Sequence, residues 1–195
     1  NFEEETDGHG GKMYSWMNAA HAMAANINRA FKEHGWTVKI RGVKSGGEVQ
    51  NLPTHVFETG DGSKDLKCPT EVSITDRREG ELSKAGLIGL IHRQHTDKAA
   101  FIGAQSLHEP PEFEDNPIGN YATSNAKLGA RLPYLFATCR FAHYLKHMVR
   151  NKIGGYMEKD DMQRWLGNWI NNYVEASDTA SETAKAKRPL KSAEV

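Results

Sequence analysis

Cysteine is scarce in this 195-residue sequence, which has two thiols, Cys68 and Cys139. Neither has a Cys or His partner at the spacing of a metal site, and two cysteines cannot form a disulfide framework. Long apolar runs are also missing, because no stretch approaches the roughly 20 residues that a membrane-spanning helix needs. The sequence therefore indicates a reducing, cytoplasmic setting and no membrane insertion.

A net charge is absent as well. The 25 Lys and Arg residues balance the 25 Asp and Glu residues. A neutral chain lacks the overall positive field of a non-specific nucleic-acid binder, so nucleic acid is not an expected partner. An electrostatic partner would have to meet a local patch of charge.

Complete catalytic and cofactor motifs are lacking too. The glycines in residues 42–47 and 60–62 match neither the P-loop nor the dinucleotide-binding spacing, and we interpret both segments as turns. His143 and His147 have the spacing of two zinc ligands on a helix. However, Tyr144 follows the first of them where a metalloprotease has Glu, and no third ligand is suggested. We predict no catalytic residue, no metal site and no cofactor.

The most informative stretch covers residues 132–174, whose pattern predicts two amphipathic helices joined by Gly154 and Gly155. In the second helix, Trp165, Trp169 and Tyr173 recur at four-residue spacing and are typical of a core. We interpret both cysteines as small buried hydrophobes. In the first helix, apolar residues at spacings of three and four predict one buried stripe, made of Leu132, Leu135, Cys139, Ala142, Leu145, Val149 and Ile153.

The other side of the first helix is basic. No Asp or Glu occurs between Ala122 and Met157. Such a one-signed surface indicates docking, although from the residues alone a solvated helix face is an equally good interpretation. We call this candidate subunit interface the basic ridge, and it consists of Arg140, His143, Lys146, His147 and Arg150.

The remaining pattern mixes helices with strands, which predicts an α/β (α+β) fold with a mixed β-sheet and packed helices. We expect residues 13–34 to form a helix that ends at Gly35 and shares a core with the helix of residues 132–153, burying Leu145. A capping box at Asp76 and Glu79 predicts a short helix over 77–85. Residues 108–120 are expected to form an irregular loop. Strands are expected at 36–43, 55–58, 70–74, 87–91 and 99–102.

We expect residues 1–174 to form a core domain and residues 175–195 a tail. The tail is rich in Ser, Thr, Ala, Glu and Lys. Ser177 and Ser181 are suitable N-caps for a short helix that stops before Pro189.

Several blocks of the sequence, taken in order, resemble the large sheath subunit of the bacterial type VI secretion system, the TssC/VipB family. The resemblance implies a contractile tail sheath-like fold and an internal piece of a larger subunit, with further regions before and after it. The blocks are IRGV at 40–43, KCPTEVSITDRRE at 67–79, FIGAQS at 101–106, RFAHYLKHMVRNKIG at 140–154 and RWLGNWINNYV at 164–174.

The resemblance implies a structural role without an active site. The subunit would assemble with a small sheath subunit (TssB/VipA-like) and with copies of itself into a helical tube around an inner tube of hexameric rings (Hcp-like). Contraction would drive effector delivery. Further partners would be a baseplate and, indirectly, an AAA+ disassembly ATPase, in a membrane-anchored apparatus. The resemblance also places a pre-terminal helix against the inner tube, here with the cations Lys185, Lys187, Arg188 and Lys191.

Two alternatives remain open at this point. One is an enzyme whose site is completed by missing parts of the chain, which predicts a deep pocket with perturbed pKa values. The other is a nucleic-acid-binding module that uses residues 127–152, which predicts binding that falls steeply with salt.

Overall fold

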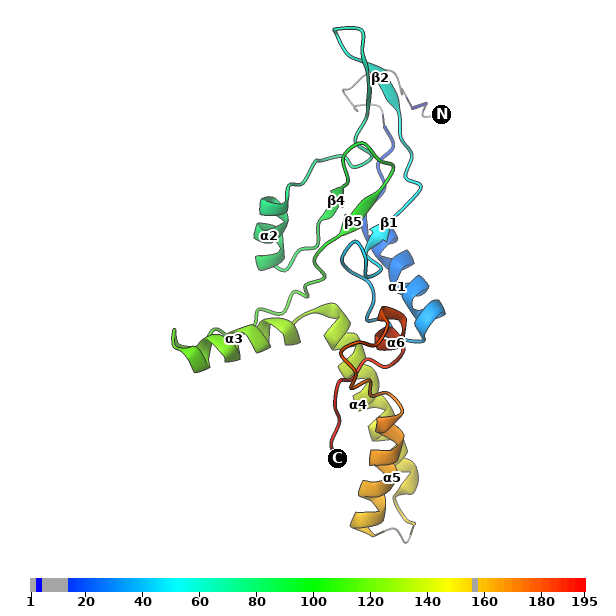
Figure 1. The fold of residues 1–195 in the computed structure, drawn as a ribbon, viewed down its shortest axis with the longest axis vertical. Helices are drawn as coiled ribbons and strands as arrows, with labels where there is room; N and C mark the ends of the chain where they lie inside the picture. The colour runs from blue at the N-terminus through cyan, green and yellow to red at the C-terminus, as the bar shows by residue number, and fades with distance from the viewer. Residues whose placement is uncertain (1–2, 5–13, 156–157) are drawn as a thin grey trace. The chain divides into compact units, whose positions relative to one another are not determined.

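The computed structural model describes residues 3–4, 14–155 and 158–195 (Figure 1). The chain divides into two compact units. The first unit comprises residues 1–28 and 40–109, and the second comprises residues 29–39 and 110–195. Helices and small sheets occur together, so the expected α+β class is confirmed. In both sheets the paired strands are antiparallel.

Helix α1 (Ala20–His34) begins where the Asn18 side chain accepts a hydrogen bond from the amide of Ala20, at 2.9 Å. It ends at Gly35, as predicted, because a φ of +74° places this residue in the left-handed region that glycine adopts without strain. The predicted start is wrong, since residues 14–18 lie outside the helix. Met13 lies outside the described residues. The helix buries Met23, Asn26 and Ala30.

A three-stranded antiparallel sheet is at the centre of the first unit. Its order is β1 (Glu48–Val49), β5 (Ala99–Phe101), β4 (Leu90–His92), and Ile91 pairs with Ala100. All three β5 residues are buried, which confirms the apolar strand predicted at 99–102. The strand predicted at 87–91 is confirmed but begins three residues later.

The strand predicted at 36–43 is wrong. Gly42 has a φ of +75°, which an extended strand does not allow. Its amide instead donates to the carbonyl of Phe101 at 2.7 Å, so the chain turns onto the end of β5. Ile40 is nevertheless fully buried, which shows that the apolar pattern marked burial and not strand geometry.

A β-hairpin of β2 (Val56–Glu58) and β3 (Lys64–Leu66) forms the second sheet. The strand predicted at 55–58 and the turn at 60–63 are therefore confirmed. The strand predicted at 70–74 is wrong, because the partner of β2 follows the turn directly and pairs Phe57 with Asp65.

Helix α2 (Asp76–Lys84) matches the helix predicted at 77–85 to within one residue. Its N-cap is Thr75, whose hydroxyl accepts from the amide of Arg78, and not Asp76. The helix ends before Gly86, whose φ is +76°. The helix was thus predictable from the sequence, although its N-cap lies one residue before the predicted one.

Three helices make up most of the second unit. Helix α3 (Pro117–Gly129) begins inside the predicted loop, after the N-cap Asn116. Helices α4 (Leu132–Lys152) and α5 (Lys159–Asn171) confirm the predicted pair, and Gly154, with a φ of +93°, lies between them.

Aromatic rings form the core of the second unit. Trp36 is 4% exposed and stacks on Phe141 of α4, with ring centroids 4.7 Å apart. Tyr173 lies edge-on to both rings, at 5.4 and 5.6 Å, and Trp169 of α5 lies 5.2 Å from Tyr173. The core predicted for the second helix is therefore confirmed for Trp169 and Tyr173. Trp165 is half-buried, and its ring centroid lies 5.0 Å from the Lys152 ammonium group.

The apolar stripe predicted for α4 is wrong in its position. Cys139, Ala142, Val149 and Ile153 are exposed, and Leu145 is half-buried. Phe141 instead faces the core. Small and branched apolar residues produced the periodic signal, but the aromatic rings bury more surface and determine which face turns inward. The predicted burial of both cysteines is wrong, because Cys68 is half-buried and Cys139 is exposed.

The chain ends with α6 (Glu182–Lys187), whose N-cap is the predicted Ser181. Val174 and Leu190 form a parallel bridge, and the amide of Glu175 donates to the carbonyl of Leu190 at 2.8 Å. Residues 175–190 thus return to the end of α5. The division into a core of residues 1–174 and a tail of residues 175–195 stays a prediction.

Candidate functional site

The basic ridge occupies α4, and the structure separates its members into two groups. His143, Lys146, His147 and Arg150 are exposed, whereas Arg140 is half-buried. In the part of the chain that the structure describes, no carboxylate lies within ion-pair distance of the four exposed residues. These four therefore form the solvent-facing part of the ridge, and we call them the outer face of α4.

Arg140 joins the aromatic core instead. Its guanidinium carbon lies 4.3 Å from the ring centroid of Trp36 and 5.3 Å from that of Phe31. Its Nε donates to the hydroxyl of Tyr144 at 3.2 Å, and its Nη1 donates to the carbonyl of Gly35. A planar guanidinium can stack and donate at the same time, so Arg140 ties the C-terminal end of α1 to α4. Its inclusion in a docking surface is not supported by this geometry.

Replacing Arg140 with Lys is expected to weaken the end of α1, because an ammonium group cannot stack on a ring and donate to both oxygens. The expected loss is about 1–2 kcal/mol, from the stacking and one charged hydrogen bond. Amide hydrogen exchange of residues 31–36 in the full-length protein would measure it. Arg150→Lys on the exposed face is the control, and equal exchange in both variants would contradict the role of Arg140.

The two histidines of α4 lie next to each other on the helix surface. The rings of His143 and His147 stack with centroids 6.5 Å apart. Among residues 3–4, 14–155 and 158–195, no group of three or more His, Cys, Asp or Glu side chains is arranged to hold a metal ion. The same residues contain no helix with the length and apolar character needed to cross a bilayer.

Two carboxyl groups in the first unit have lowered pKa values. Hydrogen bonds from the hydroxyls of Ser63 and Thr59 lower the pKa of Asp61 to about 2. These contacts close the turn between β2 and β3. The Gln50 amide is the main cause that lowers the pKa of Glu48, and Lys98, 3.5 Å away, lowers it further. Both carboxylates have local structural partners, which is typical of turns and sheet edges and not of acid–base catalysis.

The cations of the tail are mostly paired within the tail. Lys191 lies 2.7 Å from Asp178, and Arg188 lies 3.4 Å from Glu175. Lys185 donates to the carbonyl of Asp178 at 3.0 Å. In the described part of the chain, Lys187 is the one tail cation for which no ion pair is found. The carboxylates of residues 175–195 equal the cations in number and are Glu175, Asp178, Glu182 and Glu194.

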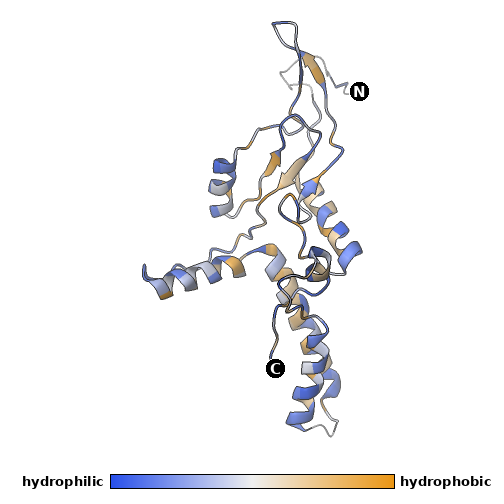
Figure 2. Cartoon of the chain, viewed as in Figure 1, coloured by the Kyte–Doolittle hydropathy of each residue, from blue (hydrophilic) through white to orange (hydrophobic). Residues whose placement is uncertain are grey.

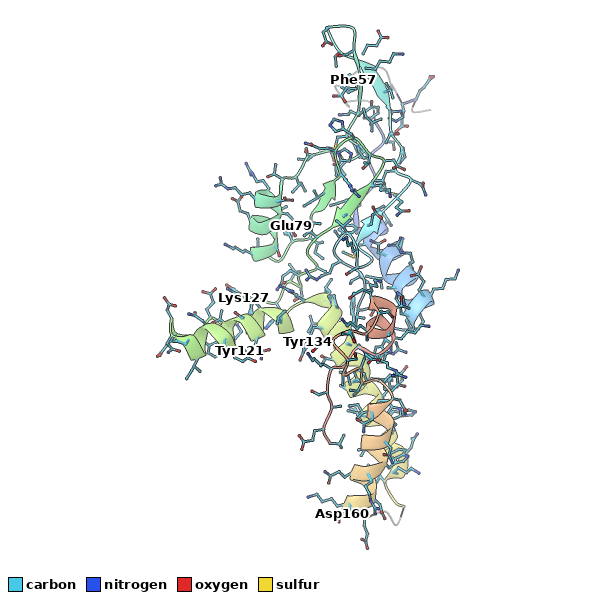
Figure 3. All side chains as sticks on the ribbon, viewed as in Figure 1. Phe57, Glu79, Tyr121, Lys127, Tyr134 and Asp160 are labelled. Carbon is cyan, nitrogen blue, oxygen red and sulfur yellow. The ribbon has the colours of Figure 1, made fainter. Side chains whose placement is uncertain are left out.

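Helix α3 has an exposed apolar face that was not among the sequence-based predictions. Ile118, Tyr121 and Leu128 are 83%, 77% and 48% exposed. They recur at spacings of three and seven, so they lie on one side of the helix. In the hydropathy colouring of Figure 2, α3 carries both apolar and polar residues. Tyr121 is labelled in Figure 3 together with Lys127 of the same helix. The signal was available in the spacing but was hidden by the prolines at 110, 111 and 117, which suggested a loop.

Comparison with known protein families matches both parts of the chain. Residues 1–108 match the family described as EvpB/VC_A0108, tail sheath N-terminal domain. Residues 121–195 match the family described as EvpB/VC_A0108, tail sheath gpW/gp25-like domain.

A curated relative is similar over the whole chain. The type VI secretion system sheath protein TssC1 of Pseudomonas aeruginosa is 62% identical over 195 residues. The alignment covers 100% of this chain and 38% of that relative.

Proposed function

Because the chain belongs to the EvpB/VC_A0108 tail sheath family, we propose that it forms part of the wall of a contractile type VI secretion sheath. The observation that carries this proposal is the 62% identity to a sheath protein over all 195 residues. The family is one of structural sheath proteins, which speaks against an enzyme. Since the chain spans 38% of the relative's length, the activity of the whole subunit is part of the proposal.

The proposed partners are those of a sheath subunit. The large subunit would assemble with a small sheath subunit and with neighbouring copies of itself into a helical tube around the hexameric rings of an inner tube. Further proposed partners are a baseplate and an AAA+ ATPase, which would act on the contracted sheath through the small subunit. The proposed location is the bacterial cytoplasm, within a membrane-anchored apparatus.

The structure supports a mechanical role through the contrast between its core and its surface. The aromatic core of the second unit, with Trp36 and Phe141 buried, favours a rigid body. The outer face of α4 carries exposed charges, and exposed ion pairs contribute only about 0–1 kcal/mol each. A sheath that contracts must exchange one set of contacts for another between rigid subunits, and many weak polar contacts allow this exchange.

To test the proposal, the full-length protein to which this chain belongs is co-produced with the small sheath subunit, and the product is examined by electron microscopy. Hollow tubes are expected. A soluble complex that forms no tubes under any ionic condition would contradict the proposal.

The nucleic-acid alternative predicts DNA binding that weakens by orders of magnitude between 50 and 200 mM salt, and we expect no such binding from the complex.

We also propose that the tail faces the inner tube. Reversing Lys185, Lys187 and Arg188 to Glu in the full-length protein is expected to leave tubes that retain the inner tube several-fold less well. Each ion pair between a tail cation and the inner tube is weak, but many sheath subunits bind the same inner tube, so their contributions combine. Co-sedimentation of the inner-tube protein with purified sheaths measures retention. Reversal of three exposed cations elsewhere, Lys32, Lys44 and Lys64, is the charge-matched control, and equal retention in both variants would show that this placement is wrong.

A further inference from the structure

We propose that the exposed apolar face of α3 docks onto the outer face of α4 in a neighbouring copy of the protein. This inference rests on the proposed sheath function and specifies one of its contacts between copies. The apolar face consists of Ile118, Tyr121 and Leu128 on α3.

The apolar face of α3 has the character of an interface. A helix of 13 residues is marginal in water by itself, and helices gain most of their stability by burying an apolar side. Ile118 and Tyr121 are 83% and 77% exposed, so this side is not buried against the described chain. An aromatic and an aliphatic residue on one exposed face are typical of contact with another protein.

Negative charge borders the N-terminal end of this face. Glu114 and Asp115 are exposed, and their carboxylates accept hydrogen bonds from the side-chain amides (Nδ2) of Asn116 and Asn120, at 3.3 and 3.0 Å. In the described residues neither carboxylate has a cationic partner, whereas Glu112 pairs with Lys127 at 3.1 Å. Glu114 and Asp115 therefore remain available to a cation from outside the described residues.

The outer face of α4 has the complementary character. Phe141, on the core side of α4, packs near Trp169 of α5, with ring centroids 6.2 Å apart. With 3.6 residues per turn, His143 and Arg150 point to the opposite side of the helix. Lys146 and His147 flank them. Exposed Val149 and Ile153 lie beside Lys146, at 37% and 77% exposure. This surface thus combines cations with apolar side chains, as the surface on α3 combines carboxylates with apolar side chains.

A second copy is the occupant that this arrangement favours. Among the described residues the two surfaces do not cover each other, because the residues of both are exposed. Each copy carries one acidic and one basic surface on a chain without net charge. A contact between two different surfaces of identical chains repeats head to tail, and it produces an open helical assembly unless the rotation closes a ring. Complementary charges then set the register of the contact.

Charge exchange within the full-length protein tests this contact. Variant one reverses Glu114 and Asp115 to Lys, and variant two reverses Lys146 and Arg150 to Glu. Each is expected to reduce the number of tubes at least tenfold when produced with the small partner, because like charges then face each other. The combined variant carries both changes, restores opposite charges across the contact and is expected to recover tubes. Recovery is specific for two surfaces that meet each other.

The contribution of the apolar face of α3 is tested by Tyr121→Asp. This variant is expected to form few tubes, and adding both charge reversals should not restore them.

All the substituted positions are exposed, so we expect the variants to fold and to co-purify with the small subunit as the unmodified protein does. Loss of the small subunit from variant one would overturn the proposal, because α3 would then bind that subunit. If every charge-reversed variant still forms tubes, the proposed docking of α3 onto α4 is wrong, and the sheath function is unaffected. Absence of tubes from the unmodified protein would contradict the sheath function, and the docking with it.

A cross-link provides an independent measurement. Two forms of the full-length protein with different tags carry Ile118→Cys and Val149→Cys, respectively, in a background in which the native cysteines, Cys68 and Cys139 among them, are replaced by Ser. In mixed tubes, a short thiol-specific linker is expected to join the two tags. Pairing Ile118→Cys with Lys84→Cys, at an exposed position on α2, is the control. Equal yields for both pairs would overturn the proposed contact.

Discussion

Replacing Trp36 with alanine is expected to destabilise the second unit by about 3–5 kcal/mol, the usual cost of removing a buried aromatic side chain. Trp36 is 4% exposed and contacts Phe141, Tyr173 and the guanidinium of Arg140. Alanine leaves a cavity among these rings. It also leaves the Arg140 guanidinium without the ring closest to it.

Amide hydrogen exchange of residues 136–149 in the full-length protein measures this loss. Because each 1.4 kcal/mol corresponds to a factor of ten, exchange should accelerate roughly 100-fold or more. Tyr134 is 58% exposed on the same helix, so Tyr134→Ala is the control and should change exchange little. Unchanged protection of α4 in the Trp36 variant would show that the ring is not what holds the unit together.

Replacing Gly47 with alanine is expected to disrupt the junction between the 42–47 turn and β5. A Cβ at this position would lie 2.4 Å from the carbonyl oxygen of Phe101 and 2.6 Å from the amide nitrogen of Gly42. Both neighbours are backbone atoms, so no side chain can move to make room. The turn must open, with loss of the hydrogen bond from the Gly42 amide to Phe101. The expected cost is about 2–4 kcal/mol, from overpacking and one lost hydrogen bond.

Gly60→Ala is the matched control, because its added Cβ meets nothing within 4 Å. Exchange of the β5 amides in the full-length protein should rise strongly in the Gly47 variant and remain unchanged in the Gly60 variant. If the Gly47 variant protects β5 as well as the unmodified protein does, then the close approach of the two backbones is not required for the sheet.

The elements that could be predicted share one property, which is that their signals are local. Gly35 and Gly154 mark helix ends because a left-handed residue ends a helix wherever it occurs. The turn at 60–63 defines the β2–β3 hairpin, and Ser181 caps α6, for similar reasons. Such features depend on a few neighbouring residues, so the chain sequence contains all the information they need.

The two wrong predictions at residues 36–43 and 108–120 have different causes. The alternation at 36–43 identified Ile40 as buried but not the turn that buries it, because Gly42 bonds to Phe101, which is 59 positions away in the sequence. The prolines before α3 indicated a loop, although Pro117 occupies the first turn of that helix, where proline is tolerated. The first prediction failed because the burial of Ile40 depends on a distant partner, and the second because a proline in the first turn of a helix gives the same local signal as a proline in a loop.

The sequence by itself determined the family, the α+β composition, the α4–α5 pair and the one-signed charge of α4, because these follow from ordered blocks, spacing and residue type. Tertiary structure alone decided which side of α4 turns inward. The rings of Trp36, Phe141 and Trp169, from the segment after α1 and from α4 and α5, pack together there. Arg140 stacks on Trp36 and therefore belongs to this core and not to the exposed basic surface. Stacking requires aromatic rings from separate segments to come into contact, and the residue spacing within α4 gives no information on where those other segments lie.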